Sequence, residues 1–343
     1  MIYCFHLKYK SIVMKRFFLF IALIVFSLVS CSNDSDNDTD SGHGGKNFLV
    51  SSYLRGNFYN NGNISSTSLN ACTDIICIGA TPNADGSLSF ETFELHNGEG
   101  VTTYPELVAS VKSKLADNIS IRLGISGGAN WKKMVSSETA INNFARNVNN
   151  IIETLDLDGV DLDFEWANTQ EEYDNYSNAI ILLAKTLDDD DIFSVTLDPI
   201  SYKISNKAID AVTYISLQCY GPSPIRFSYD NYISSIQKLI SYGVPNRKIV
   251  PGLPFYGVTA DDSKATVTYF TLVNNGLINS SSINEVTYNT ESYVFNGQDL
   301  IKKKVNYAIS QSFYGVMSWS LGTDVDYTNE WSLLRSINSC LTK

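Results

Sequence analysis

The sequence predicts an α/β fold: a single (β/α)8 TIM barrel, in which eight parallel strands alternate with helices. Three observations lead to this prediction. From residue 48 onward, eight short and nearly continuous apolar runs alternate with longer amphipathic stretches. Continuous apolar runs are typical of parallel strands that helices cover. No linker-like segment interrupts the alternation, and a length of about 300 residues fits one closed barrel.

The eight apolar runs define the expected strands, in chain order residues 48–53, 75–80, 120–125, 159–164, 193–197, 214–219, 248–253 and 315–320. Between them, apolar residues recur every three or four positions, which is the spacing of one helical face. The expected helices cover residues 105–116, 141–155, 173–187, 232–240, 299–310 and 330–341. Ser136 and Ser137 are candidate caps for the second of these. A doubly wound open sheet is the structural alternative, but no glycine-rich phosphate loop follows the first strand to support it.

The segment 258–297 breaks this rhythm. It is rich in Thr, Asn, Ser and Tyr and lies between the seventh strand and its helix. We therefore expect a small insertion at this point of one domain that covers residues 47–343.

The first 31 residues predict a targeting segment. Two basic residues after Met14 precede an apolar run at 17–29. This run is too short to span a membrane, which needs about 20 residues, but it suits the core of a signal peptide. It ends in a serine followed by Cys31, which resembles the bacterial lipoprotein signal. We therefore expect lipidation of Cys31, with residues 1–13 upstream of the true start; an ordinary cleaved signal is the alternative.

Residues 32–46 follow Cys31 and contain no large apolar side chain. Such a stretch cannot bury enough surface to offset the entropy of ordering it. It predicts a flexible tether between a lipid anchor and the folded domain. The expected location is the cell envelope, with the membrane as a partner through the lipid.

Composition excludes several classes of function. The formal net charge is −11, and nucleic-acid binding needs clustered basic residues. A neutral polar ligand such as a sugar fits better, but the charge by itself favours acidity that only aids solubility. The chain holds three His, and its Cys spacing matches no zinc or redox pattern. We expect a monomer with no metal and no cofactor.

The most informative segment is the fourth expected strand, which carries Asp161, Asp163 and Glu165 at alternate positions. Side chains of a strand alternate between its faces, so the three carboxyls share one face while the apolar residues between them occupy the other. If the apolar face packs against helices, the acids must point into the barrel. They would then follow the strand toward its carboxyl end, where barrel enzymes place their sites.

Three inward acids at this spacing repel one another. Positions two residues apart on a strand are about 7 Å apart, which gives roughly 2 kcal/mol of repulsion at an effective dielectric of about 20. At least one acid should therefore hold a proton near neutral pH. A protonated carboxyl beside a carboxylate is what a glycosidase needs to protonate a leaving oxygen. One alternative is a solvated acidic loop, which the apolar residues between the acids disfavour. The other is a calcium loop, which would need more closely spaced oxygen ligands.

The segment 158–165, Asp-Gly-Val-Asp-Leu-Asp-Phe-Glu, resembles the DxxDxDxE signature of glycoside hydrolase family 18, the chitinases and endo-β-N-acetylglucosaminidases. Other expected strand ends resemble family elements in the same order, so the resemblance covers residues 48–343. Those elements are Ser126-Gly127-Gly128 (a partial fit), Gln218-Cys219-Tyr220, the segment 253–257 and the segment 317–321.

The resemblance implies roles for four residues. Glu165 would protonate the glycosidic oxygen, after which the sugar's own 2-acetamido oxygen attacks the anomeric carbon. Asp163 would hydrogen-bond the acetamido N–H and stabilise the positive charge, and Asp161 would trade a proton with Asp163. Tyr220 would hold the acetamido carbonyl in line for attack; a core tyrosine is the alternative.

Four further residues are candidate substrate contacts. By the resemblance, Trp319 forms the floor of the central sugar subsite, and an indole face is a natural platform for a pyranose. Gln218 points the same way as Tyr220 and could bond a sugar or satisfy a buried neighbour. Tyr53 ends the first expected strand and could line the site. Tyr256 is as consistent with a structural role as with a contact to ligand.

Two positions depart from the family pattern. Many chitinases carry Asp or Asn after the strand-six tyrosine, where this chain has Gly221, and many carry Arg where it has Val258. The segment 258–297 is also shorter than the insertion of processive chitinases. The expected consequence is an open, shallow cleft that favours endo-cutting of short or soluble chains.

Three functions remain open from the sequence. The first is hydrolysis of chitin or chito-oligosaccharides, and its rival is an endo-β-N-acetylglucosaminidase that acts on N-glycans. The third is a non-catalytic surface protein that binds glycans. The presence of Glu165, Asp163, Asp161 and Tyr220 favours an enzyme, because non-catalytic relatives typically lose the acid.

Overall fold

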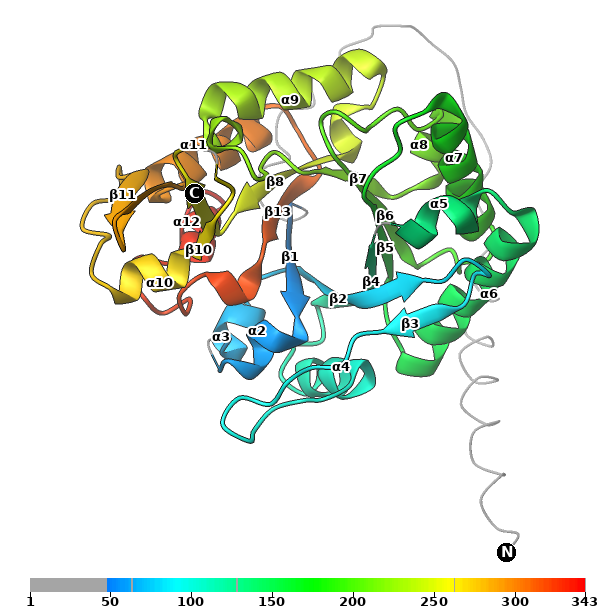
Figure 1. Cartoon of the computed structure of the whole chain (residues 1–343), viewed down its shortest axis with the longest axis horizontal. Helices are drawn as coiled ribbons and strands as arrows, with labels where there is room; N and C mark the ends of the chain where they lie inside the picture. Colours follow the sequence, from blue (N-terminus) through cyan, green and yellow to red (C-terminus); the bar gives the residue numbers. More distant parts are fainter. Residues whose placement is uncertain (1–47, 63, 128, 262, 343) are drawn as a thin grey trace, which may run out of the picture. The chain divides into compact units, whose positions relative to one another are not determined.

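The computed structural model describes residues 48–62, 64–127, 129–261 and 263–342. At its centre eight parallel strands pair in the order β1-β13-β8-β7-β6-β5-β4-β2. Strand β1 also pairs with β2, which closes the ring into a barrel surrounded by helices (Figure 1). The predicted (β/α)8 fold is confirmed, and the open-sheet alternative is wrong because a closed ring has no free edges.

All eight expected strands are present. They are β1 (Leu49–Arg55), β2 (Asp74–Pro82), β4 (Ser120–Gly127), β5 (Gly159–Phe164), β6 (Ile192–Leu197), β7 (Tyr214–Leu217), β8 (Ile249–Pro254) and β13 (Gly315–Trp319). A short strand, β3 (Leu88–Phe90), pairs antiparallel with the end of β2. Strand β7 ends earlier than expected because the Cys219 N–H turns back to the Leu217 carbonyl at 2.7 Å.

Helices lie around the barrel (Figure 1). They are α2 (Gly56–Asn60), α3 (Ser66–Leu69), α4 (Tyr104–Lys112), α5 (Ala129–Val135), α6 (Glu138–Leu155), α7 (Gln170–Ala184), α8 (Asn206–Ala211), α9 (Tyr229–Tyr242), α11 (Gln298–Ser310) and α12 (Leu333–Asn338), with 3₁₀ turns η1 (Pro224–Phe227), η2 (Asn246–Lys248) and η3 (Leu321–Thr323). Ser137 caps α6 as predicted, accepting from the Ala140 N–H. Within the described residues, none of these helices has the length and hydropathy of a membrane span.

The predicted insertion is confirmed. Between β8 and α11 the chain forms β9 (Tyr256–Thr259), β10 (Thr266–Thr268), α10 (Tyr269–Asn274), β11 (Glu285–Tyr288) and β12 (Glu291–Val294). The four strands make a separate antiparallel sheet in the order β10-β9-β12-β11. Because β9 starts two residues after β8 ends, this sheet is anchored at the carboxyl end of the barrel.

The barrel has an apolar outer face and a more polar interior. Outside, the Trp131 ring of α5 stacks on Phe164 of β5 with centroids 5.4 Å apart, and Tyr176 of α7 meets Phe164 edge-on at 4.9 Å. Both contacts cover Phe164, an outward residue of β5, so the residues that alternate with it must point inward. The predicted signal segment, Cys31 and the tether at 32–46 lie outside the described residues.

Candidate active site

Strand β5 projects its acids into the barrel. Asp161 is fully buried and Asp163 is 5% exposed, while Leu162 and Phe164 between them pack outward into the apolar core. The apolar residues of β5 thus anchor the strand against α5 and α7. The same alternation that predicted one acidic face now places two carboxyls inside the ring.

Glu165 lies in the turn directly after β5 and is exposed. Its Oε1 accepts a hydrogen bond from Gln218 Nε2 at 3.1 Å, and the same amide nitrogen donates to Asp163 Oδ1 at 3.2 Å. Gln218 comes from the end of β7, across β6 from the acids. One amide therefore holds both carboxyls at the carboxyl end of the barrel, the face where this fold places its chemistry.

Asp161 is the deepest of the three acids and the most constrained. Its Oδ1 accepts from Ser194 Oγ at 2.5 Å, and its Oδ2 accepts from the Tyr53 hydroxyl at 2.7 Å. The Tyr53 hydroxyl also lies 2.6 Å from Thr196 Oγ1. Both oxygens of a buried carboxyl are thus satisfied, as burial requires.

Burial and charge act together on the two inner acids. Burial raises the pKa of Asp161, although the positive charge of Arg122 and the bond from Ser194 oppose the rise. The pKa of Asp163 lies well above its ordinary value, because of burial first and then the charges of Glu165 and Asp161. The predicted proton among the acids is therefore favoured on Asp163.

Tyr220 follows β7 and is 6% exposed. Its hydroxyl faces the Met317 sulfur at 3.7 Å, and its ring meets that of Tyr256 edge-on at 6.2 Å. Burial raises its pKa, with further contributions from Tyr256, Asp163 and Glu165. Tyr220 therefore sits within the electrostatic reach of the acids as a neutral hydroxyl that can donate a hydrogen bond.

Trp319 ends β13 and is partly buried against the same inner cluster as Tyr220 and Tyr256. Its indole lies 5.4 Å from the ring of Tyr53. Tyr53 itself is 1% exposed, and β1 continues beyond it to Arg55. The structure places Tyr53 beneath Trp319 and against Asp161, so its contact is with the acid; a contact with sugar stays a prediction.

Tyr256 begins β9 at the junction of barrel and insertion. Its ring packs edge-on against Phe227 at 5.4 Å, and its hydroxyl donates to the Gly221 carbonyl at 3.4 Å. The Ser126-Gly127-Gly128 element ends β4, with Ser126 in register with Asp163; Gly128 lies outside the described residues.

An ion pair at the mouth is not evident from the sequence. Arg226 of η1 donates from Nη2 to Asp198 Oδ2 at 2.8 Å and to the Gln218 carbonyl at 2.7 Å. A Cβ at Gly221 would lie 2.7 Å from Arg226 Nη1. The glycine that departs from the family pattern thus leaves space for a guanidinium brought by a neighbouring loop, and no spacing rule connects the two positions.

An apolar rim surrounds part of the mouth. Trp166, Ile200 and Ile225 are 41%, 79% and 68% exposed, and they follow β5, β6 and β7 in turn. Trp166 and Ile200 lie two and three residues after their strands, and Ile225 lies in η1; their exposure is not evident from the sequence.

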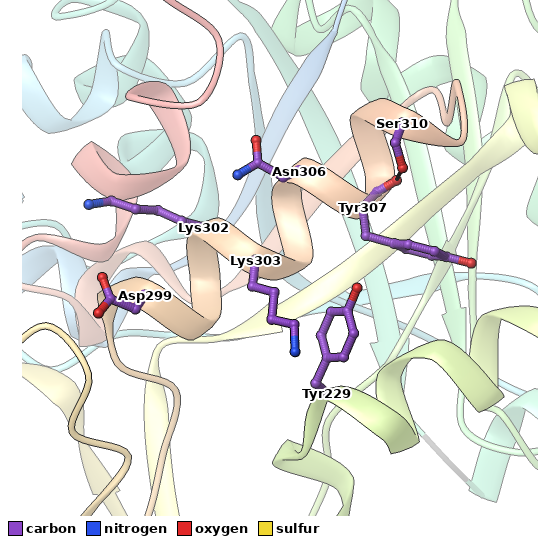
Figure 2. Close-up of a pocket in the computed structure, with 7 residues that line it drawn as sticks. All are labelled: Tyr229, Asp299, Lys302, Lys303, Asn306, Tyr307 and Ser310. Atoms are coloured by element: carbon purple, nitrogen blue, oxygen red, sulfur yellow. Dashed lines mark hydrogen bonds between the residues drawn. The ribbon is translucent and has the colours of Figure 1, made fainter.

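A surface hollow lies away from these residues, on α11 and the start of α9 (Figure 2). Lys303 lies over the Tyr229 ring at 3.8 Å, and Gln237 donates to the Tyr307 hydroxyl at 3.1 Å. The labelled polar side chains Asp299, Lys302 and Asn306 spread along α11 and do not converge on one point (Figure 2). Across the described part of the chain, no group of His, Cys, Asp and Glu is placed to hold a metal ion.

Comparison with known proteins places this site in a family. The family model of glycosyl hydrolases family 18 matches residues 50–324. A curated relative, the "Probable chitinase 2" of Drosophila melanogaster, is 25% identical over 192 residues, which are 48% of this chain and 40% of that protein. The match thus spans less than half the length of that relative.

Solved structures share the fold. The chitinase ChiB from the chitin utilization locus of Flavobacterium johnsoniae is 25% identical with a TM-score of 0.70, covering 87% of this chain and 94% of that one. A Bacteroides thetaiotaomicron chitinase is 17% identical with a TM-score of 0.72, covering 87% and 97%. A Nicotiana tobaccum class V chitinase in complex with NAG4 is 15% identical with a TM-score of 0.69, covering 86% and 99%. With its signature acids inside the barrel and a family match over most of its length, the chain belongs to glycosyl hydrolases family 18.

Proposed function

We propose that this protein is a retaining glycosidase that cleaves β-1,4 bonds of chitin, chito-oligosaccharides or related N-acetylglucosamine glycans. The observation that carries the proposal is the single amide of Gln218, which holds Asp163 and Glu165 side by side at the mouth. Glu165 is exposed there, and Asp163 behind it is buried. An accessible acid backed by a protonated carboxyl suits proton delivery to a leaving oxygen.

The proposed reaction has two steps. In the first, Glu165 gives its proton to the glycosidic oxygen while the 2-acetamido oxygen attacks the anomeric carbon, so the C–O bond breaks and an oxazolinium forms. In the second, the Glu165 carboxylate takes a proton from water, which attacks the anomeric carbon and opens the ring. The configuration at that carbon is retained, because it is inverted twice.

The surrounding groups would hold the acetamido group in place. The Tyr220 hydroxyl is available to donate to the acetamido carbonyl, and Asp163 to accept from its N–H. Trp319 is partly exposed at the end of β13, where its indole face can carry the apolar face of a pyranose. Such positioning replaces a bimolecular attack by an intramolecular one, which is a large rate advantage.

Substitution of the acid tests the mechanism. We expect Glu165→Gln to lower the turnover of chitohexaose by at least about 100-fold, because general acid catalysis contributes on this scale. Calorimetry should show that the variant still binds the oligosaccharide. The matched control is Glu171→Gln, which removes an exposed carboxylate at the start of α7. Unchanged turnover in Glu165→Gln, beside an unchanged control, refutes the role of Glu165.

Product analysis separates the substrate classes. The wild-type chain is incubated with chitohexaose and, in parallel, with a high-mannose glycoprotein. Shorter chito-oligomers with the β-anomer formed first support the proposal. Release of intact N-glycans without chito-oligomer cleavage assigns the endo-β-N-acetylglucosaminidase function instead. Binding of chitohexaose with no cleavage of either substrate assigns a glycan-binding protein.

We also propose that Cys31 carries lipid and holds the domain at the cell envelope. The support is the sequence at 17–31, which resembles a lipoprotein signal. Metabolic labelling with a palmitate analogue should mark the wild-type chain and leave Cys31→Ser unlabelled. Equal labelling of both proteins contradicts the proposal.

A further inference from the structure

Beneath Asp161 the barrel interior contains a buried cationic network. Arg122 of β4 pairs with Asp74 of β2 through two bonds, from Nε to Oδ1 at 2.7 Å and from Nη2 to Oδ2 at 2.8 Å. The Arg122 guanidinium also contacts the Tyr214 hydroxyl of β7. All three side chains are fully buried. A buried arginine is rare unless it is paired, and here one of its nitrogens remains for a further acceptor.

That nitrogen, Nη1, has two acceptors: the Val160 carbonyl of β5 at 3.2 Å and Ser194 of β6. Arg122 Nη1 donates to Ser194 Oγ at 2.8 Å, and Oγ in turn lies 2.5 Å from Asp161 Oδ1. The registers of β4 and β6 explain the geometry: both Gly124 and Ser194 lie beside Asp161. Arg122, two residues before Gly124, therefore sits one layer nearer the amino ends of the strands.

The direction of these bonds follows from the donors available. A guanidinium has only N–H donors and no acceptor. Ser194 Oγ must therefore accept from Arg122, and its single hydrogen is left to donate to Asp161 Oδ1. Hydrogen bonds that an ionised carboxylate accepts favour the ionised form, and a donor that itself bonds a cation is strengthened. The arrangement at Oδ1 thus favours an ionised Asp161.

Other groups face Asp161 from each neighbouring element. The titratable or charged ones inside the barrel are Tyr53 of β1, Arg122 of β4, Asp163 of β5 itself and Tyr214 of β7. Tyr176 of α7 lies on the outer side of β5, against Phe164, within the electrostatic reach of Asp161. Burial raises the pKa values of all three tyrosines, so they are neutral. Arg122 is the one cation in this set.

We propose that Arg122, acting through Ser194, is a positioning residue that keeps Asp161 ionised and the proton of the carboxyl pair on Asp163. This inference rests on the proposed hydrolase function for its catalytic meaning. A protonated Asp163 does not repel the negative charge that develops on Glu165 as Glu165 gives its proton to the glycosidic oxygen. A negative Asp163 would oppose that step, because like charges held close together disfavour each other.

The test is Ser194→Ala in the full chain, with kcat and KM for chitohexaose measured across pH. Loss of the Ser194 donor makes Asp161 harder to ionise. On the acidic side of the kcat profile, activity rises as Asp161 loses its proton. This rise should therefore move to higher pH by about one unit. We expect kcat at the wild-type optimum to fall about tenfold, with KM within about twofold of the wild type.

Two matched variants separate this role from packing. Ser216→Ala on β7 also removes a fully buried barrel hydroxyl, but among the described residues Ser216 Oγ has no hydrogen-bond partner. It should leave the pH profile unchanged. Ser194→Thr keeps a hydroxyl and should restore the acid limb. A wild-type profile in folded Ser194→Ala, or an equal shift in Ser216→Ala, overturns the proposal.

A second measurement needs no variant at Ser194. Carboxyl ¹³C resonances of the wild-type protein should show Asp161 ionised at a pH where Asp163 is still protonated. The two signals are assigned by their loss in Asp161→Asn and Asp163→Asn. A proton found on Asp161 instead overturns the proposal even if Ser194→Ala does not fold. The resonances report the position of the proton whether or not the protein cleaves glycans. Absence of cleavage would therefore refute the hydrolase function and leave the proposal about the proton to be decided by the resonances.

Discussion

At the scale of single residues, Gln218 connects the acids more directly than its sequence context indicated. A lone glutamine after an apolar run has no preferred chemistry, and a sugar contact and a structural bond were both open. The structure uses its two amide hydrogens on two carboxyls, Asp163 and Glu165. The amide therefore compensates repulsion between the acids as well as orienting them.

The substitution Gln218→Met tests this role, because it keeps the length of the side chain and removes the donors. Hydrogen bonds to charged groups contribute about 1.5–3 kcal/mol, so we expect kcat to fall by roughly 10- to 100-fold. Steady-state kinetics on chitohexaose provide the measurement. Gln237→Met, on the exposed side of α9, is the control. A variant with wild-type kcat would show that the Gln218 amide only fills space.

Arg226 and Gly221 are the second case at this scale. The sequence showed only that Gly221 replaces a family Asp or Asn. In the structure that gap is filled by a guanidinium, held by Asp198 and the Gln218 carbonyl. The space left by the missing side chain at Gly221 is thus filled by the Arg226 side chain, which comes from η1.

At the scale of elements, strand β8 positions Tyr220 through the absence of a side chain. A Cβ at Gly252 would lie 2.6 Å from the Tyr220 ring and 2.9 Å from the Leu217 carbonyl. Neither neighbour can easily move, because one is a backbone atom and the other a buried ring. Glycine at 252 is therefore required for Tyr220 to lie where it does.

The substitution Gly252→Ala should displace the Tyr220 ring. Overpacking of this kind costs about 1–3 kcal/mol of unfolding free energy. If Tyr220 holds the acetamido group, kcat should fall by about 100-fold, since small misplacements are expensive in an intramolecular attack. Denaturant unfolding and turnover are measured on the same preparation. A destabilised variant with full turnover would show that Tyr220 has no positioning role.

At the scale of the whole molecule, Lys304 joins parts of the chain that are distant in sequence. Its ammonium donates to the Phe227 carbonyl at 3.0 Å and to Asn296 Oδ1 at 2.6 Å, tying α11 to η1 and to the exit of the insertion. Lys304 is fully buried. Burial lowers its pKa to about 7.

This pKa predicts a pH dependence of stability. Between about pH 7 and the ordinary lysine pKa, the unfolded chain holds a proton on Lys304 that the folded chain has released. Unfolding then takes up a proton, so the unfolding free energy rises with pH through this window. The Tm of the wild type minus the Tm of Lys304→Met should therefore rise from pH 7 to pH 10, because only the wild type gains stability from Lys304 in this window. The exposed Lys303→Met is the control, and a difference that does not change with pH contradicts the prediction.

The barrel and its acidic column follow from the sequence alone. Eight apolar runs were enough to predict eight strands, because a parallel strand covered by helices must be apolar. The alternation of Asp161, Asp163 and Glu165 with Leu162 and Phe164 was enough to predict one inward face, since the period of a strand is fixed at two. These inferences need only local geometry and burial.

The way the acids are held depends on the folded barrel and does not follow from the sequence. Arg122, Ser194, Gln218 and Arg226 come from different strands and loops, and they meet because the ring closes. No local rule links residues so far apart in the chain, and their contacts depend on the stagger between neighbouring strands. The position of the proton in the acidic column follows from that stagger, because it is the closed barrel that brings one buried cation beneath Asp161.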